Sequence, residues 1–306
     1  MSGSPRRPLL LLVNPAAGGK PASGRRLSND PTRLEPEALA ESFRAQGLDV
    51  RLQILSEDDD LVQLTRSVAD RYDVVVAGGD GTVGPVALAL VESPATLGIL
   101  ALGSFNNVAR GLGLPDELDS AIAVIASGRV THVDVGTAER EAAEPESFLE
   151  AGGIGLEAMG FGAVLLAERR GVRHALGFLR RTLRRVPTGI ELVIDGRRVV
   201  TTAPTVVICN GPFHGLGFTL APDADPTDGQ LDLAIFERMG RLRTIVHYLR
   251  VARGRPLRDP RVRSERGTQI RVRGQHGALP VHVDGRPIGL TPVTFRLRPG
   301  ALRVFR

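Results

Sequence analysis

Short apolar runs alternate with amphipathic segments through the first part of the chain. The apolar runs 9–13, 74–77 and 97–101, together with the alternating segment 50–55, predict strands. The segments between and after them carry the apolar spacing or the end signals of helices, which we place over 37–46, 56–69, 85–91, 105–112 and 118–126. Strands that alternate with helices predict a parallel, doubly wound α/β sheet.

The pattern changes near residue 130, where short strands begin to follow one another. Asp-Gly pairs at 195–196 and 284–285 are turn signals typical of antiparallel strands. The expected strands are 132–136, 148–151, 190–194, 199–202, 206–209, 231–235, 270–272, 281–283, 293–297 and 302–305, with helices over 157–167, 171–185 and 242–252. We therefore predict a Rossmann-like α/β domain over 1–130 and a mostly β, sandwich-like domain over 131–293.

Composition places the chain among globular α/β proteins. It has 306 residues, of which 42% are hydrophobic, and no apolar run approaches the roughly 20 residues that a spanning helix needs. Arg6 and Arg7 precede the run 9–13 in the manner of a signal peptide, but that run is too short. Cys209 is the only cysteine, which fits a reducing compartment. We expect a cytoplasmic protein, soluble or peripheral at the inner face of the membrane.

The charge balance favours anionic partners. The net charge is +5 and the pI is near 10.4, which suits nucleotides, acidic lipid headgroups or nucleic acid. With no tryptophan and two tyrosines, the chain lacks the aromatic residues that nucleic-acid binders interleave with basic ones, so we expect no nucleic-acid partner. Arginines around an apolar stripe over 165–185 fit either a helix that lies on anionic lipid or a solvated arginine face.

A glycine-rich stretch after the third predicted strand carries the clearest chemistry. The strand over 74–77 runs into Gly78-Gly79-Asp80-Gly81-Thr82 and then into a predicted helix. Glycines let the backbone approach a ligand closely, and a helix N-terminus directs free N–H groups at an anion. The stretch therefore predicts a phosphate cradle. Asp80 adds negative charge there, which indicates either Mg²⁺ between the acid and the phosphate or a base near the transferred group.

Two more loops follow predicted strands in the same way. The segment 14–20, which begins Asn-Pro, follows the first strand, and the segment 102–110 follows the fourth. Ligands of open α/β sheets bind at the carboxyl ends of the strands, so these loops are expected to contribute to one site. Further along, three acids within 223–228 repel one another, which favours a bound cation.

With these motifs the sequence resembles the diacylglycerol kinase catalytic-domain family of lipid kinases, which includes sphingosine and ceramide kinases and the bacterial soluble diacylglycerol kinases. The family has an Asn-Pro loop, Gly-Gly-Asp-Gly-Thr and Gly-(Thr/Ser)-x-Asn, matched here at 14–15, 78–82 and 103–106. A later Pro-x-Ala-x-x-x-Asp-Gly motif is matched at 222–229, and a terminal Asp-Gly-Glu is matched in part at 284–286. The resemblance implies that the tail, 294–306, returns to complete the N-terminal domain.

The resemblance implies ATP and Mg²⁺ as cofactors and assigns the site residues. The implied nucleotide-binding positions are Asn14, Pro15, Ala16, Ala17, Gly18, Ser56, Gly79, Asp80, Gly81, Thr82, Ser104 and Asn106. The implied Mg²⁺ ligands are Asp228 and the backbone carbonyls of Asp225 and Gln230. Asp284 is the expected catalytic base, with Asp80 as the competing candidate.

We therefore expect a lipid kinase that transfers the γ-phosphoryl group of ATP to a lipid hydroxyl at a membrane surface. Diacylglycerol is the simplest acceptor, and a sphingoid base or another lipid alcohol is the alternative. Arg286 stands where the family has glutamate, so a catalytically impaired nucleotide- or lipid-binding protein is a further alternative. Asp134 matches an acid of the bacterial enzymes, and a homodimer is left open.

Overall fold

The computed structural model describes residues 6–17, 35–160, 189–237, 246 and 260–306, and the statements below concern these residues. The chain divides into two compact units. Unit 1 comprises Met1–Val133 with Pro299–Arg306, and unit 2 comprises Asp134–Arg298. The unit boundaries fall inside two strands, β5 (Val130–Glu139) and β16 (Val293–Phe305), within a few residues of the domain boundaries that we predict from sequence.

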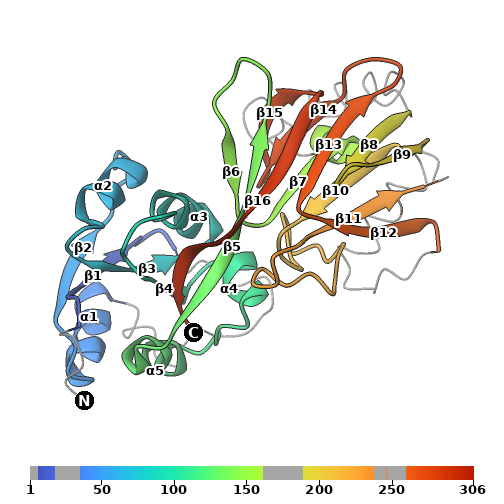
Figure 1. Ribbon diagram of the computed structural model, residues 1–306. Helices are drawn as coiled ribbons and strands as arrows, with labels where there is room; N and C mark the ends of the chain where they lie inside the picture. Colours follow the sequence, from blue (N-terminus) through green and yellow to red (C-terminus); the bar gives the residue numbers. More distant parts are fainter. Residues whose placement is uncertain (1–5, 18–34, 161–188, 238–245, 247–259) are drawn as a thin grey trace. The chain divides into compact units, whose positions relative to one another are not determined.

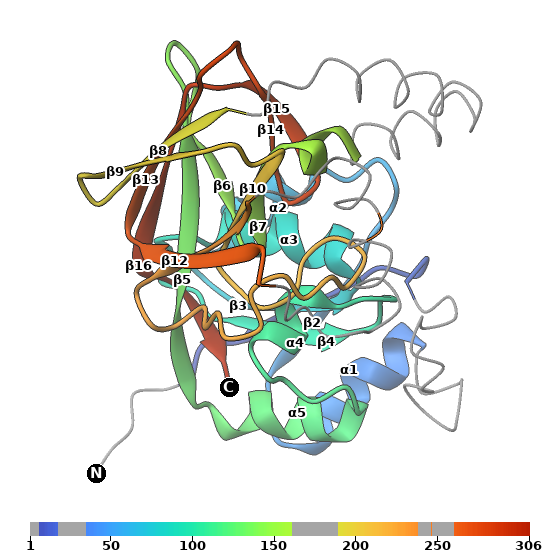
Figure 2. The ribbon, with the colours of Figure 1, turned by 90° about the vertical axis from the view of Figure 1, so that its right-hand side faces the viewer.

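Unit 1 contains a parallel sheet with helices on both faces (Figure 1). The strand order is β2 (Val50–Ile54), β1 (Leu9–Val13), β3 (Asp73–Gly78), β4 (Leu97–Ala101) and then the end of β16, which pairs with β4 through Val304 and Leu97. The helices are α1 (Pro36–Ala45), α2 (Leu61–Val68), α3 (Asp80–Ala89), α4 (Asn107–Gly111) and α5 (Leu118–Ser127). The α1–α5 and α2–α3 pairs cover opposite faces, as Figure 2 also shows. The predicted doubly wound sheet is confirmed.

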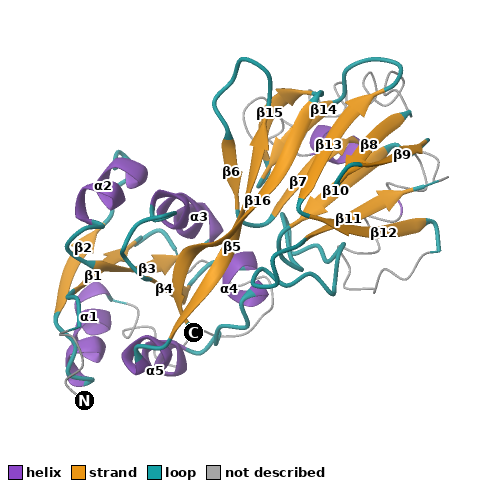
Figure 3. Cartoon of the chain, viewed as in Figure 1, coloured by secondary structure: helices purple, strands orange, loops and turns teal. Residues whose placement is uncertain are grey.

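Unit 2 is a pair of antiparallel sheets (Figure 3). Its remaining strands are β6 (Glu146–Phe148), β7 (Ala151–Gly155), β8 (Ile190–Ile194), β9 (Arg197–Thr201), β10 (Thr205–Cys209), β11 (Leu231–Phe236), β12 (Val262–Gly267), β13 (Gln269–Gly274), β14 (Pro280–Val283) and β15 (Arg286–Leu290). One sheet runs β16-β13-β8-β9, with β5 beside β16 and β6 beside β5, and the other runs β12-β11-β10-β7-β14-β15. Apolar side chains from both sheets, such as Phe295 and Ile154, form one buried core between them, so the predicted mostly β domain is confirmed.

The first turns of two helices differ from their prediction. Helix α3 begins at Asp80, so the glycine-rich stretch is its first turn and not a loop before it. Gly79 caps it with an extended backbone, and its carbonyl accepts the N–H groups of Thr82 and Val83. Helix α2 begins later than predicted because Asp60, and not Ser56, accepts the free N–H groups of its first turn.

The segment predicted as one strand over 148–151 is a crossover. The chain leaves one sheet of unit 2 at the end of β6 and enters the other at the start of β7. Strands β7, β12 and β15 are absent from the prediction, whereas the two predicted C-terminal strands form the single strand β16. The predicted helix over 171–185 lies outside the described residues, as do most of those over 157–167 and 242–252. None of the described helices is long and apolar enough to cross a membrane.

Candidate functional site

The glycine-rich turn of unit 1 is fastened to the loop after β1. Asn14 follows β1, and its Nδ2 donates to the Thr82 hydroxyl oxygen at 2.9 Å. The Asn14 backbone N–H bonds the Ala77 carbonyl oxygen, while its Oδ1 accepts the Ala16 N–H. These bonds hold the Asn-Pro loop against the first turn of α3. They arise because β1 and β3 are neighbours in the sheet and both end at the same edge.

The loops after β3 and β4 touch through glycines. A Cβ atom on Gly103 would lie 2.5 Å from the Gly79 Cα, and one on Gly79 would lie 3.0 Å from the Gly103 Cα. Asn106 closes the second loop from a left-handed conformation, with φ of 51°. Its Oδ1 accepts the Gly103 N–H, and its Nδ2 donates to the carbonyl oxygens of Ala101 and Gly103. The two loops can approach each other this closely only because neither glycine has a side chain.

Asp80 joins the two loops at the start of α4. Its carboxylate accepts backbone hydrogen bonds from Asn106, Asn107 and Val108, the first N–H groups of that helix. Burial raises the pKa of the Asp80 carboxyl, and these hydrogen bonds oppose the rise. Asp80 therefore acts as the acidic cap of α4, a contact that spans two neighbouring strand ends.

In unit 2, Asp284 lies at the centre of a network of backbone bonds. It occupies the turn between β14 and β15 with φ of 44°, followed by Gly285 with φ of 74°. Its two carboxylate oxygens accept the N–H groups of Leu149 at 2.8 Å, Glu150 at 3.0 Å and Ala151 at 3.1 Å. Those three N–H groups belong to the crossover between β6 and β7. The crossover thus presents successive N–H groups to one acid.

A second segment, 210–215 after β10, is attached to the same crossover. The Asn210 N–H bonds the Glu150 carbonyl oxygen, and the Gly215 N–H bonds the Glu150 carboxylate. Asn210 Nδ2 donates to the carbonyl oxygens of Leu149 and Asp134. The crossover that bonds Asp284 is thus itself held in place by the segment after β10.

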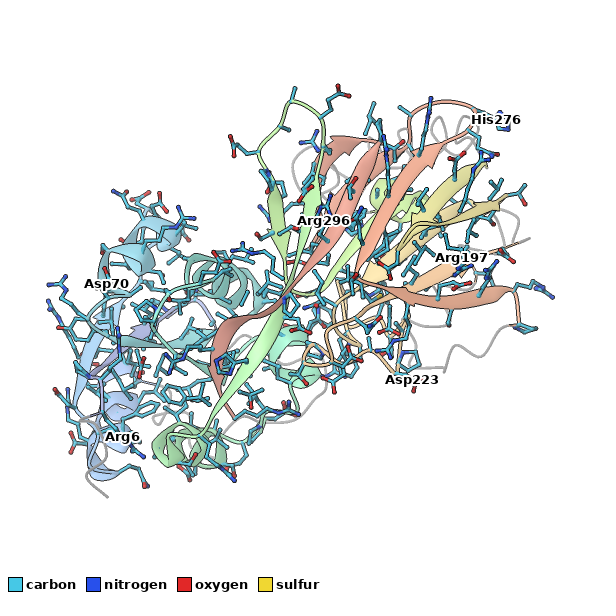
Figure 4. The ribbon with its side chains drawn as sticks, viewed as in Figure 1. Arg6, Asp70, Arg197, Asp223, His276 and Arg296 are labelled. Atoms are coloured by element: carbon cyan, nitrogen blue, oxygen red, sulfur yellow. The ribbon has the colours of Figure 1, made fainter. Side chains whose placement is uncertain are left out.

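Asp134 connects this network to the acidic loop that leads into β11. Its Oδ2 accepts the Gly229 N–H at 2.7 Å, and its own N–H donates to the Pro226 carbonyl oxygen. Asp223 marks this loop in Figure 4. Gly229 has φ of 75°, a conformation that glycine adopts without strain. The acidic loop is held in place by Asp134 through direct bonds.

In the acidic loop an arginine pairs with Asp228, while the Mg²⁺ site that combines this carboxylate with two backbone carbonyls stays a prediction. Arg266 of β12 is ion-paired with the Asp228 carboxylate and lies 3.2 Å from Asp232. The other Asp228 oxygen accepts the Gln230 N–H, and Asp225 Oδ1 accepts two bonds from Thr227. Within the described part of the chain, no three His, Cys, Asp or Glu side chains are placed to hold a metal ion. The Arg266 guanidinium thus balances the negative charge of this loop, where the sequence predicts a bound metal cation.

The comparisons with known proteins follow the division into two units. Residues 8–138 match the diacylglycerol kinase catalytic domain, and residues 157–306 match the YegS C-terminal NAD kinase beta sandwich-like domain. A "Probable lipid kinase YegS-like" of Chromohalobacter salexigens is 30% identical over 274 residues, which cover 85% of this chain and 84% of that protein. The chain belongs to the YegS-like lipid kinases.

Further relatives of this lipid kinase agree. A "Probable lipid kinase YegS-like" of Klebsiella pneumoniae is 27% identical over 288 residues, covering 90% of this chain and 91% of that protein. The crystal structure of a diacylglycerol kinase from Bacillus anthracis superimposes with a TM-score of 0.70 at 22% identity, covering 98% and 96% of the two chains, and supports the fold. Kinase family membership implies ATP use, as the glycine-rich turn predicts.

The site residues predicted from sequence fall into two groups. The bonded cluster of unit 1 contains Asn14, Gly79, Asp80, Thr82 and Asn106. Five other predicted positions of unit 1 are exposed, namely Pro15, Ala16, Ser56, Gly81 and Ser104. Gly18 lies outside the described residues. Asp225, Asp228, Gln230 and Asp284 lie in unit 2. Arg286, which replaces the family glutamate, is exposed and contacts β6 through the Ser147 carbonyl oxygen and the Glu146 carboxylate.

Sequence reasoning missed a buried cluster in unit 2, made of Glu157, His214 and His282. The six histidines of the sequence show no metal-ligand spacing. A signal was nevertheless present. Glu157 is the only charged residue in the segment 151–167, and a lone acid in such a stretch is buried with a partner.

Exchanging Arg266 for glutamine tests whether this residue takes the place of a metal. Asp228 and Asp232 would lose their cation, so R266Q is expected to lose about 1 kcal/mol of unfolding free energy at neutral pH. The loss should shrink in acid, because burial raises the pKa of the Asp232 carboxyl and a protonated Asp232 no longer pairs with Arg266. Added Mg²⁺ should raise the Tm of R266Q but not that of the nucleotide-free wild type. Arg198→Gln, which breaks an exposed pair with Glu191, is the control. Stabilisation of the nucleotide-free wild type by Mg²⁺ would contradict the assignment.

Proposed function

We propose that this lipid kinase transfers the γ-phosphoryl group of MgATP to the free hydroxyl of diacylglycerol, producing phosphatidic acid. Unit 1 binds the nucleotide through the loops after β1, β3 and β4. Unit 2 holds the lipid hydroxyl near Asp284. Mg²⁺ bound to the ATP phosphates would supply neutralisation of their charge.

The anchored Asp284 carboxylate is the observation that carries this proposal. A base for an attacking hydroxyl must be oriented and must be able to accept a proton near neutral pH. Three backbone N–H groups orient Asp284, and one of its oxygens, Oδ2, accepts only one of those bonds, so it retains capacity to accept another. Burial raises the pKa of the Asp284 carboxyl, against those bonds and the charge of Arg286, which makes it a stronger base than an exposed aspartate.

Asp80 suits a different task. Its carboxylate is occupied by the N–H groups that begin α4, so we assign it to shaping the nucleotide loops. The acceptor proton then leaves to Asp284 while the new bond forms between the lipid oxygen and the γ-phosphorus. ADP departs as the leaving group. In-line transfer of this kind depends on positioning of the phosphates more than on covalent help from the protein.

The membrane surface is the expected working place of the enzyme, because the acceptor is a membrane lipid. The net charge of +5 favours anionic headgroups. The arginine-rich segment that suggested membrane docking lies outside the described residues, so the proposal rests here on charge and substrate chemistry alone.

Transfer of label from γ-labelled ATP to a panel of pure lipids tests the acceptor. The panel is diacylglycerol, ceramide, a sphingoid base and a polyprenol, each in zwitterionic and in anionic vesicles. We expect labelled phosphatidic acid, formed faster on anionic vesicles. Label in another lipid would overturn the choice of acceptor but not the kinase. No label in any lipid, with ATP still bound, would favour the impaired enzyme suggested by Arg286.

A further inference from the structure

Three ionisable side chains are buried together inside unit 2 and have no part in the reaction as proposed above. Glu157, His214 and His282 are 5%, 2% and 1% exposed. Glu157 lies two residues beyond the end of β7, His214 lies in the segment after β10, and His282 belongs to β14. The Glu157 carboxylate lies between the imidazoles, with Oε1 2.8 Å from His214 Nε2 and Oε2 3.2 Å from His282 Nε2.

The structure determines which nitrogen of His282 carries its proton. The Gly285 N–H donates to His282 Nδ1 at 3.2 Å, so Nδ1 must present a lone pair. The ring proton then resides on Nε2, which lies 3.2 Å from Glu157 Oε2. Burial raises the pKa of the Glu157 carboxyl, and its contacts with the two imidazoles lower it overall, so the group is an anion beside the two rings.

The bond from Gly285 to His282 acts on the Asp284 turn directly. Asp284 and Gly285 both have left-handed backbone, which for aspartate is maintained only by surrounding contacts. The Asp284 N–H is fixed by the Ala151 carbonyl oxygen, and the Gly285 N–H is fixed by His282. Loss of the second contact frees the plane of the peptide that joins Asp284 to Gly285.

Local packing reserves the space for this cluster. A Cβ atom on Gly153 of β7 would overlap Glu157 Oε2 and His282 Nε2, so glycine at this position admits both polar groups. Strand β7 also pairs with β14 through Gly153 and His282, which keeps the imidazole in register with the acid. The cluster is thus built by three segments of unit 2 and not by a flexible surface contact.

We propose that Glu157 is a positioning residue for the kinase reaction, holding His282 in the Nε2–H tautomer so that its Nδ1 accepts the Gly285 N–H and fixes Asp284. This inference rests on the proposed function, in which Asp284 accepts the proton of the lipid hydroxyl. His214 supplies the second donor to the carboxylate. An amide at position 157 would instead present N–H groups to the His282 imidazole. This favours the tautomer with the proton on Nδ1, and that proton would repel the Gly285 N–H.

The first test reads the tautomer in the wild-type protein. Nitrogen-15 NMR of the labelled imidazoles should show His282 with a protonated Nε2 and an unprotonated Nδ1. This measurement needs no variant that has to fold, and it does not depend on catalysis. A protonated Nδ1 on His282 would overturn the inference even if Asp284 proves to be the base.

The second test is a double-mutant cycle of Glu157→Gln and His282→Asn. Asparagine places an acceptor near the Nδ1 position and needs no help from residue 157. We expect E157Q to lower kcat about 100-fold with the KM for ATP unchanged. In the H282N background the same exchange should have little effect on kcat. Glu191→Gln, at a surface ion pair, is the control and should retain wild-type kcat.

The outcomes separate the inference from the proposed function. Equal kcat losses from E157Q in both backgrounds would indicate general structural damage and overturn the positioning role. If Asp284→Asn leaves kcat intact, the proposed function fails, while the NMR result still decides the tautomer. A wild-type kcat in E157Q would overturn the inference directly.

Discussion

Asp284→Asn is expected to lower kcat by about three orders of magnitude while the enzyme still binds ATP. Asparagine keeps one acceptor oxygen but places an amide against backbone donors and provides no proton acceptor, and a general base contributes about 10²- to 10⁴-fold. The measurement is kcat at saturating ATP and lipid, with nucleotide binding followed separately. A D284N enzyme within tenfold of wild type would contradict the role.

Asp195 offers a matched control within the same unit. It too occupies an Asp-Gly hairpin turn with a left-handed backbone, and its carboxylate accepts N–H groups from Thr268 and Gln269. Asp195→Asn removes a comparable set of bonds from a turn that has no link to the Asp284 network. We expect Asp195→Asn to lower the Tm and leave kcat unchanged. Equal kcat losses in both variants would show that Asp284 acts only as a turn anchor.

The pH dependence of wild-type kcat provides an independent check on Asp284. Burial is the main cause of its raised pKa, and the charge of Arg286 opposes the rise. Because the base acts as a carboxylate, kcat should fall as pH drops through that pKa, which lies above the ordinary 3.8. In Arg286→Gln the acid limb should move to higher pH. If the acid limb does not move, it reports the ionisation of another group.

Gly103→Ala is expected to raise the KM for ATP at least tenfold and to destabilise unit 1. The new methyl group would lie 2.5 Å from the Gly79 Cα and 2.8 Å from Asn106 Oδ1, so the two loops must separate. Overpacking against backbone costs about 1–3 kcal/mol of unfolding free energy. Thermal unfolding and ATP titration in the variant measure the two effects.

Gly84→Ala is the matched control for this exchange. Gly84 lies in α3, and a Cβ atom there meets nothing within 4 Å. Alanine is the better helix former, so G84A is expected to gain about 0.5–1 kcal/mol of unfolding free energy with unchanged KM for ATP. If G103A behaves like G84A, the contact between the two glycine loops has no part in nucleotide binding.

The elements that could be predicted accurately are those with a strong local signal. The strands over 9–13, 97–101 and 190–194 were predicted with the same bounds as the structure has, because each is a short segment dominated by apolar residues. Gly128 ends α5 in a left-handed conformation, as its position predicts. The Asp-Gly turns and the glycine-rich turn were likewise evident, since their backbone needs particular residues.

Strand β7 shows why other elements could not be predicted. Its sequence, Ala-Gly-Gly-Ile-Gly, has almost no strand propensity. The glycines at 152 and 153 are explained only by Phe295, Glu157 and His282, whose side chains fill the space that a Cβ atom would take. Phe295 and His282 come from distant parts of the chain, so no local pattern reveals the strand.

The sequence alone was sufficient to identify the family and the two-part architecture, because these depend on residue types at short spacing. Tertiary structure alone decided what the acids do. Asp284 meets backbone donors more than 130 positions away, Asp80 caps a helix on the next strand, and Arg266 neutralises the acidic loop. Charge, burial and hydrogen-bond partners set the chemistry of a carboxylate, and those are fixed only when distant segments pack together.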